Sequence, residues 1–168
     1  MGGTKPVRMA ALRDAVSALG FTDVATLLQS GNVVFRAPTR APAAIELLLG
    51  RALSQRLSVT TDVFVRTAAE WAAHIRANPF RAEAKADPAH LHLLTLKDLA
   101  APAQIAALRG AIRGRERVGV KGRALYAVYP DGVGRSKLTN AMIERHLGTV
   151  TTGRNWNTVL KLGAIAEE

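Results

Sequence analysis

The chain has 168 residues, of which 48% are hydrophobic and only 5% aromatic. This length allows one compact domain or two small ones, with a core built mainly from aliphatic side chains. The absence of cysteine excludes disulfides, thiol catalysis and thiolate metal sites, and it fits a cytoplasmic protein. No apolar run approaches the roughly 20 residues that span a bilayer, and no signal peptide is visible. We therefore expect a soluble cytoplasmic protein without a membrane partner.

The chain is strongly basic, because 23 Lys and Arg against 13 Asp and Glu give a formal net charge of +10. The densest basic stretch contains Arg109, Arg113, Arg115, Arg117, Lys121 and Arg123 against one acid, Glu116. Basic proteins attract nucleic acid, nucleotides and acidic partners. The alternative is codon bias in a GC-rich genome, and composition alone leaves both explanations open.

The first half of the chain alternates helical and strand patterns. Apolar residues recur at helical spacing from Met9 to Leu19, and Gly20 ends that helix. The next patterns predict a strand over Val24–Leu28, a tight turn at Ser30-Gly31-Asn32, a strand over Val33–Phe35, a helix opened by Pro42, a strand over Val63–Val65 and a helix carrying Trp71 and Ile75. Asn78-Pro79 ends this last helix.

The pattern restarts after Asp87-Pro88, so we expect one unit over residues 1–86 and a second over residues 87–168. The second unit is predicted to contain a strand over His90–Leu96, a helix opened by Pro102, strands over Arg117–Val120 and Ala124–Tyr129, a helix over Leu138–Leu147, a short strand over Thr149–Thr151 and a closing helix from Trp156.

The two halves share one order of elements. The second half reads β-α-β-β-α-β plus a helix, and the first reads the same without its opening strand. We therefore predict an α+β protein made of two ferredoxin-like (split βαβ) halves. The missing strand suggests that the natural chain begins upstream of Met1. The alternatives are a gap filled by another chain, or a rearranged and weakly stable first half.

Two segments of the second half combine glycine with cations immediately before a helical pattern. Helix starts offer unpaired backbone N–H groups and a positive dipole end, glycine lets an anion approach the backbone, and Arg or Lys adds charge. These segments predict an anion-binding site formed by Gly132, Gly134, Arg135, Ser136, Lys137, Arg154 and Asn155. The alternative is purely structural: the glycines supply turns, and Ser136 and Asn155 cap helices.

The expected topology brings these two segments to one edge. In a ferredoxin-like sheet the strand order is 4-1-3-2, so the loops after Tyr129 and Thr151 leave the same edge, about 10 Å apart. His90, Arg113 and Arg115 are expected there too. A second candidate in the first half is Ser30, Gly31 and Asn32, which also form the simplest hairpin turn.

Several blocks in order resemble one known family. They are Met9–Gly20, Gln29–Phe35, Asn78-Pro79-Phe80, Tyr129–Asn140 and Arg154–Val159. With them the chain resembles the bacterial family called domain of unknown function 1697. The resemblance implies two ferredoxin-like halves and no settled activity. Family members look to begin with a hydrophobic strand and Arg-Gly-Ile-Asn-Val-Gly-Gly, whereas Met1-Gly2-Gly3 starts at the last three of these positions.

Three functions remain open. The first is an anion-binding module for a nucleotide, RNA or a phosphorylated metabolite. The second is a structural or dimerising module that uses an exposed strand edge. The third is an enzyme acting on a phosphorylated substrate, with Asp131, Ser136, Lys137 and His90 as candidate groups. No spacing identifies a triad or a carboxylate pair, so the sequence favours binding over catalysis.

Known nucleotide and metal motifs are missing. The glycine segment is not a Walker A loop, because Gly134 is followed by Arg135 and Ser136. The strand from Lys121 to Tyr129 lacks the aromatic pattern with which RNA-recognition sheets stack bases. His90 and His92 lack a third ligand. We therefore predict neither a cofactor nor a metal.

Overall fold

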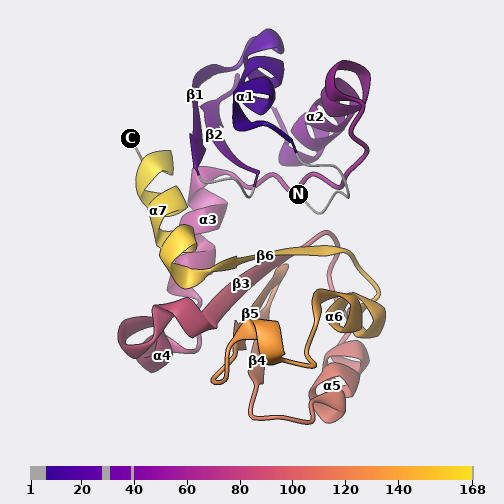
Figure 1. The fold of residues 1–168 in the computed structure, drawn as a ribbon, viewed down its shortest axis with the longest axis vertical. Coiled ribbons are helices and arrows are strands. Elements are labelled where there is room, and N and C mark those ends of the chain that lie inside the picture. Colours follow the sequence, from indigo (N-terminus) through magenta and orange to yellow (C-terminus); the bar gives the residue numbers. More distant parts are fainter. Residues whose placement is uncertain (1–6, 28–30, 39, 168) are drawn as a thin grey trace. The chain divides into compact units, whose positions relative to one another are not determined.

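The computed structural model describes residues 7–27, 31–38 and 40–167, and it shows an α+β protein, as predicted (Figure 1). The chain divides into two compact units. The first unit comprises Met1–Trp71 with Leu162–Glu168, and the second comprises Ala72–Lys161. In the described part of the chain, no helix is both long and apolar enough to cross a membrane.

The first unit packs two helices on a two-stranded antiparallel sheet. Its elements are α1 (Met9–Ala18), β1 (Thr22–Leu27), β2 (Asn32–Arg36) and α2 (Pro42–Leu57). Leu12 and Val16 of α1 share a buried cluster with Leu49 of α2. Phe21 stacks on Phe35 with ring centroids 4.8 Å apart. The helical periodicity of the sequence therefore placed these helices and their core faces correctly.

The predicted strand over Val63–Val65 is wrong, because residues 58–67 contain neither helix nor strand. The side chains of Val63 and Val65 still pack, partly buried, against the core of the first unit. The backbone N–H of Val65 donates to Glu46 Oε2 at 2.8 Å. The carboxylate of Glu46 in α2 thus takes the place of the strand neighbour that would otherwise accept from this backbone amide. Val63 and Val65 can therefore pack into the core without forming a strand.

The second unit contains a four-stranded antiparallel sheet. Its strands are β3 (Leu91–Leu96), β4 (Arg117–Lys121), β5 (Ala124–Val128) and β6 (Thr151–Asn155), in the order β4-β5-β3-β6. This is the 4-1-3-2 order expected for the second half. The helices are α4 (Arg81–Ala86), α5 (Pro102–Ala111) and α6 (Asn140–Leu147), with short 3-10 turns η1 (Pro88–His90) and η2 (Val133–Arg135). Two further helices, α3 (Ala68–Arg76) and α7 (Trp156–Ala166), cross the division between the units.

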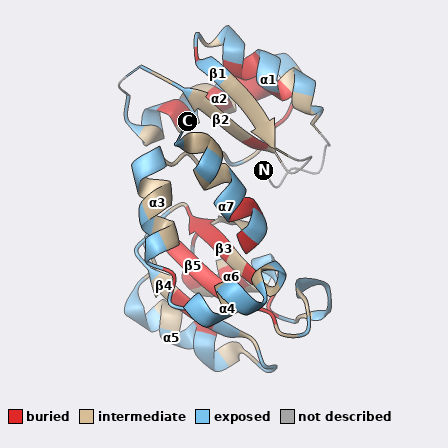
Figure 2. Cartoon of the chain, turned by 90° about the vertical axis from the view of Figure 1, so that its left-hand side faces the viewer, coloured by how far each residue is buried: buried red, intermediate tan, exposed pale blue. Residues whose placement is uncertain are grey.

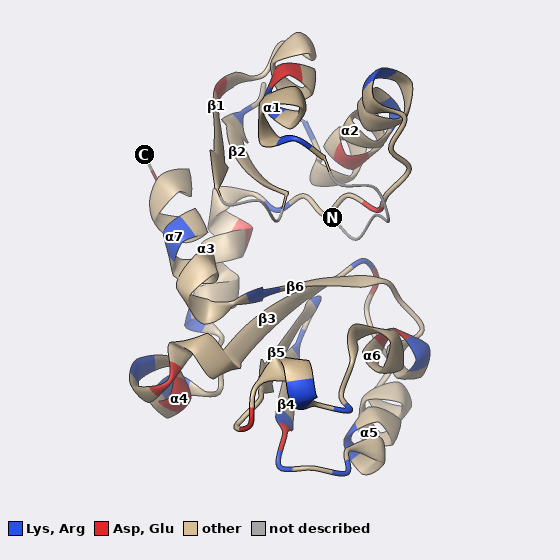
Figure 3. Cartoon of the chain, viewed as in Figure 1, with Lys and Arg blue, Asp and Glu red and all other residues tan. Residues whose placement is uncertain are grey.

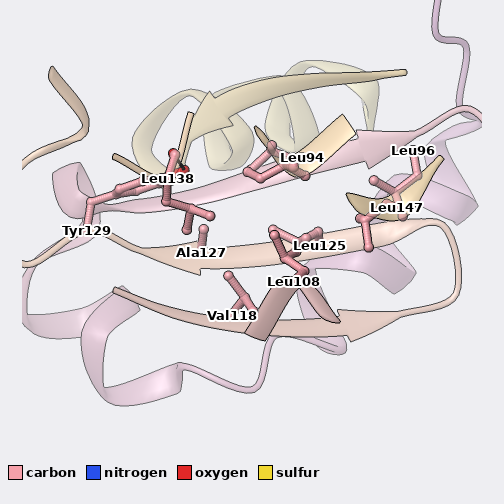
Figure 4. Close-up of a cluster of buried hydrophobic side chains, with 10 residues drawn as sticks. Leu94, Leu96, Leu108, Val118, Leu125, Ala127, Tyr129, Leu138 and Leu147 are labelled. Carbon is pink, nitrogen blue, oxygen red and sulfur yellow. Dashed lines mark hydrogen bonds between the residues drawn. The ribbon is translucent and has the colours of Figure 1, made fainter. Parts of the chain in front are cut away.

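One face of this sheet is covered by α5 and α6. Leu94 pairs with Leu125 of β5 and Gly153 of β6, which places these three residues on that face. Leu94 and Leu125 belong to a buried cluster that also receives Leu108 from α5 and Leu147 from α6 (Figure 4). We call this side of the sheet the Leu94 face.

The opposite side, which we call the Leu93 face, is covered by residues that precede β3 and by the start of α7. Leu93 pairs with Tyr126, whose hydroxyl donates to the carbonyl of His74 and whose ring lies 6.4 Å from that of Trp156. A Cβ at Gly119 would lie 2.9 Å from Pro79 Cγ, so glycine allows this close approach. Both faces of β3 and β5 are therefore buried (Figure 2).

Residues 74–83 explain why the predicted division between residues 86 and 87 lies inside the second unit. His74 and Pro79 contact the Leu93 face, and Glu83 of α4 forms an ion pair with Arg117 of β4 at 3.5 Å. Helix α4 was not predicted from the sequence. Its sequence, Arg-Ala-Glu-Ala-Lys-Ala, carries good helix formers but too few large apolar residues to show a helical period.

The predicted strand over Thr149–Thr151 begins and ends too early. β6 runs from Thr151 to Asn155, and it pairs with β3 from Leu96 back to His92. Gly and Asn have low strand propensity, but pairing with a buried central strand outweighs that preference. This shift places Arg154 inside the strand rather than in the loop that follows it.

The titration of the two tyrosines tests this packing, since the chain has no others. Burial raises the pKa of Tyr126 and Tyr129 to about 12, from an ordinary value of 10.0. A phenol whose pKa is higher in the folded state contributes stability below pH 10 and loses that contribution as the pH rises to 12. We expect the denatured chain to gain tyrosinate absorbance near pH 10 and the native protein to gain it only near 12. Native titration near pH 10 would contradict the buried positions.

Candidate functional site

Two loops of the second unit meet at the edge where β5 ends and β3 begins. Val128 of β5 lies opposite both Leu91 and Arg117. The backbone N–H of Tyr129 then donates to the carbonyl of His90 at 2.8 Å. The α5–β4 loop (residues 112–116) and the β5–α6 loop (residues 130–139) therefore reach the same end of the sheet. We call these two loops together the loop edge.

Two polar contacts hold the loop edge together. The guanidinium of Arg115 donates through two nitrogens to the carboxylate of Asp131, with 3.2 Å between Nε and Oδ2. Ser136 Oγ donates to Glu116 Oε1 at 2.7 Å and accepts from the backbone N–H of Leu138 at 3.0 Å. Each loop thus fixes the other, although neither contact was predicted from the sequence.

Asp131 lies at the centre of the basic residues expected at this edge. The hydrogen bond from Arg115 lowers the pKa of Asp131, and the charges of Arg115, Arg135 and His90 lower it further, against an opposing effect of desolvation. In return, Asp131 raises the pKa of Arg115. His90, Arg115 and Arg135 therefore all influence one carboxylate of the protein, and Arg115 contacts it directly.

Three cations of the loop edge extend into solvent. Arg113, Arg135 and Lys137 are exposed, and basic residues mark both loops in Figure 3. Within the described residues, none of their side chains makes a hydrogen bond or an ion pair. Gly132 has a φ of +86°, which the turn requires of it. Gly134 does not have a positive φ, and a Cβ atom added there would meet no other atom within 4 Å. The backbone beside Arg135 is therefore open to solvent.

The start of α6 is capped by the protein itself. Thr139, rather than Ser136, is the N-cap: its Oγ1 accepts from the backbone N–H of Met142 at 3.2 Å. Asn155 does the same for α7, because its Oδ1 accepts from the backbone N–H of Thr158 at 3.1 Å. At each helix start, one backbone N–H group is therefore taken by a side chain of the protein, and for Asn155 this matches the structural alternative of a helix cap.

Arg154 lies away from the loop edge. It pairs with Leu93 in the sheet register, so its side chain belongs to the Leu93 face. The chain of the loop edge returns instead to the Leu94 face, where Leu138 is buried. Arg154 Nη1 donates to Thr152 Oγ1 at 2.9 Å and to the carbonyl of Gly153 at 2.7 Å, and burial lowers its pKa. The structure thus corrects the composite site: Arg154 does not join Arg135 and Lys137.

The two histidines near the start of β3 have separate environments. His90 lies in η1, and its Nδ1 is 2.8 Å from Asp87 Oδ2. His92 lies in β3, edge-on to Tyr129 at 5.1 Å, and its pKa is lowered by burial and then by the charge of His90. Among the described residues, no group of three or more His, Cys, Asp or Glu could hold a metal ion.

The second candidate site belongs to the first unit. Ser30 lies outside the described residues. Gly31 has φ +79°, and the side-chain amide of buried Asn32 donates to the carbonyl of Leu27 at 3.0 Å. These contacts match the hairpin-turn alternative.

Comparisons with known proteins place the chain in a family. The model of the family described as "Protein of unknown function (DUF1697)" matches residues 1–126. The chain belongs to this family. The conserved bacterial protein SP0830 from Streptococcus pneumoniae has a similar structure, with a TM-score of 0.71 and 20% sequence identity over 98% of this chain and 92% of that one. A search of curated proteins found no match. The DUF1697 resemblance inferred from sequence blocks is confirmed, and the likeness to SP0830 concerns the fold alone.

The cap of α6 gives a test of the loop edge in this DUF1697 protein. Thr139→Ala removes the acceptor of the Met142 N–H, so we expect the free energy of unfolding to fall by about 1 kcal/mol. Thr139→Ser keeps the hydroxyl and should restore most of this loss. Denaturant unfolding measures both variants, and equal stability of Thr139→Ala and the wild type would contradict the cap.

Proposed function

We propose that the second unit binds a phosphate-bearing ligand at the loop edge, through Arg135 and Lys137. The observation that carries this proposal is the pair of contacts Arg115–Asp131 and Ser136–Glu116, which hold both loops in place. Cations on a fixed loop lose less conformational entropy on binding than cations on a mobile one. A guanidinium can grip phosphate through two N–H groups, and an ammonium adds a point charge.

The backbone around Gly134 supports the same proposal. Glycine inside a 3-10 turn costs conformational entropy, and neither φ nor local crowding demands it here. What glycine does provide is access, since a ligand can approach the backbone at Gly134 without meeting a side chain on that residue. A phosphate oxygen at this point could be reached by the guanidinium that follows.

The ligand is expected to be recognised through its phosphate rather than through base stacking. Tyr126 and Tyr129 are 0% and 1% exposed, and they lie on opposite faces of the sheet. They are therefore closed to the bases that an RNA-recognition sheet would stack. This favours a nucleotide, a phosphorylated metabolite or an RNA backbone, all of which present the same charged group. Ser136 Oγ already donates to Glu116, so binding, rather than catalysis, is the function proposed.

The charge requirement can be tested by thermal unfolding with inorganic phosphate, pyrophosphate and nucleotides. A ligand at one hundred times its Kd stabilises the native state by about 2.7 kcal/mol. Arg135→Ala with Lys137→Ala should abolish this stabilisation, whereas Arg145→Ala with Lys161→Ala removes the same charge from exposed positions elsewhere and should keep it. Added salt should weaken the effect, because the contacts are electrostatic. Loss of stabilisation in both double variants would reduce the proposal to non-specific charge attraction.

Gly134→Ala separates binding from folding. The native backbone there needs no positive φ and has space for a methyl group, so the variant should fold with unchanged or slightly higher stability. The methyl group should, however, obstruct the ligand and lower its affinity. Gly110→Ala is the matched control, since Gly110 of α5 has equal space but lies outside the loop edge. If Gly134→Ala binds phosphate ligands as tightly as Gly110→Ala, the open backbone has no role in binding.

A further inference from the structure

The four-stranded sheet of the second unit has two outer strands, β6 and β4. They differ in whether side chains form hydrogen bonds with their outward-facing backbone groups. In an antiparallel ladder, alternate residues turn their N–H and C=O toward one neighbour. Lys97 N–H donates to the carbonyl of Val150, so the alternation continues along β6. The backbone groups of Thr151, Gly153 and Asn155 therefore face outward.

Side chains occupy the outward edge of β6. Glu144 Oε2 accepts from the backbone N–H of Thr151 at 2.7 Å, and the guanidinium of Arg154 donates to the carbonyl of Gly153 at 2.7 Å. A strand that approached β6 would have to displace both contacts. These side chains therefore protect β6 from edge-to-edge pairing.

The outward edge of β4 lacks such contacts. Leu96 N–H donates to the carbonyl of Arg123, and Tyr129 N–H to that of His90. The alternation along β5 therefore directs Ala124, Tyr126 and Val128 toward β4. Their partners in β4 are Lys121, Gly119 and Arg117, so Val118 and Val120 turn their backbone groups outward. Among the described residues, nothing donates to or accepts from these outward groups.

The positive charge around β4 determines which kind of strand can pair with its outer edge. Arg117 and Lys121, at the two ends of the strand, share the Leu93 face with Gly119, and both are exposed. Only Glu83 balances them, at 3.5 Å from Arg117. A second copy of β4 paired antiparallel about Gly119 would set Arg117 against Lys121, and like charges directly opposite are destabilising. The edge therefore disfavours self-pairing and favours an acidic strand.

We propose that β4 is a docking edge for an extended acidic segment of a partner protein, which adds antiparallel to β4 as a fifth strand. Its backbone pairs with the outward groups of Val118 and Val120. Its acidic side chains lie beside Arg117 and Lys121, and its alternate, apolar side chains lie beside the valines. Val120 is half-buried against the Leu94 cluster, so that side of the added strand meets an apolar neighbour. The expected partner sequence alternates acidic and apolar residues.

The test uses a short peptide of alternating Glu and Val with blocked ends, and the same peptide with Lys in place of Glu. On titration of the whole chain, the acidic peptide should shift the backbone amide signals of Val118 and Val120 and slow their hydrogen exchange. Because a +10 chain attracts any acidic peptide, backbone pairing is tested by N-methylation. Methylation of the valine amides, which face β4 in antiparallel pairing, should abolish binding, and methylation of the glutamate amides should not.

Protein variants test the charge selection. Arg117→Gln with Lys121→Gln should lower the affinity for the acidic peptide by about fivefold. The matched pair Arg145→Gln with Lys161→Gln should leave that affinity within about twofold of the wild-type value. Equal affinity of the two N-methylated peptides would overturn strand addition. Amide shifts centred on residues 130–139 rather than on β4 would also overturn it, since they would place the peptide at the loop edge.

Discussion

The burial of β3 is the constraint on which the second unit depends. Leu91 and Leu96 are fully buried, Leu93 and Leu94 are 1% exposed, and the strand has a neighbour on each side. An apolar strand covered on both faces cannot slip by one residue, because each side chain would then change face. The register of β3 therefore fixes β5 and β6, and through them the loops that leave their ends.

The same constraint explains the polar contacts at the sheet margins. A buried central strand requires neighbours, and each outer neighbour is left with outward N–H and C=O groups. At β6 these groups are taken by Glu144 and Arg154, so an arginine beside a glycine proves to be part of strand protection. At β4, no described residue pairs with the outward backbone groups of Val118 and Val120, and cations flank them. Both edges resist association with a second copy, but among the described residues only the outward groups of β6 have side-chain partners.

Acidic residues organise the basic loop edge. In the sequence, Arg109 to Arg123 form the densest basic stretch, with a lone Glu116 inside it. In the structure, Glu116 holds Ser136 and Asp131 holds Arg115, so the few carboxylates join the two loops. The remaining exposed cations, including Arg135, therefore extend from a surface of defined shape. Net charge alone says little about such a surface, because it counts charges without their partners.

The sequence by itself determined the α+β class and most helices and strands, because hydrophobic periodicity and Gly and Pro signals are local properties. Only the tertiary structure decided the face of Arg154, the partner of Ser136 and the loss of the strand at Val63–Val65. Each depends on residues distant in the chain: the register of β3, the position of Glu116 and the carboxylate of Glu46. Local patterns give each residue a probable element, whereas its face and its bonding partner follow from packing between elements.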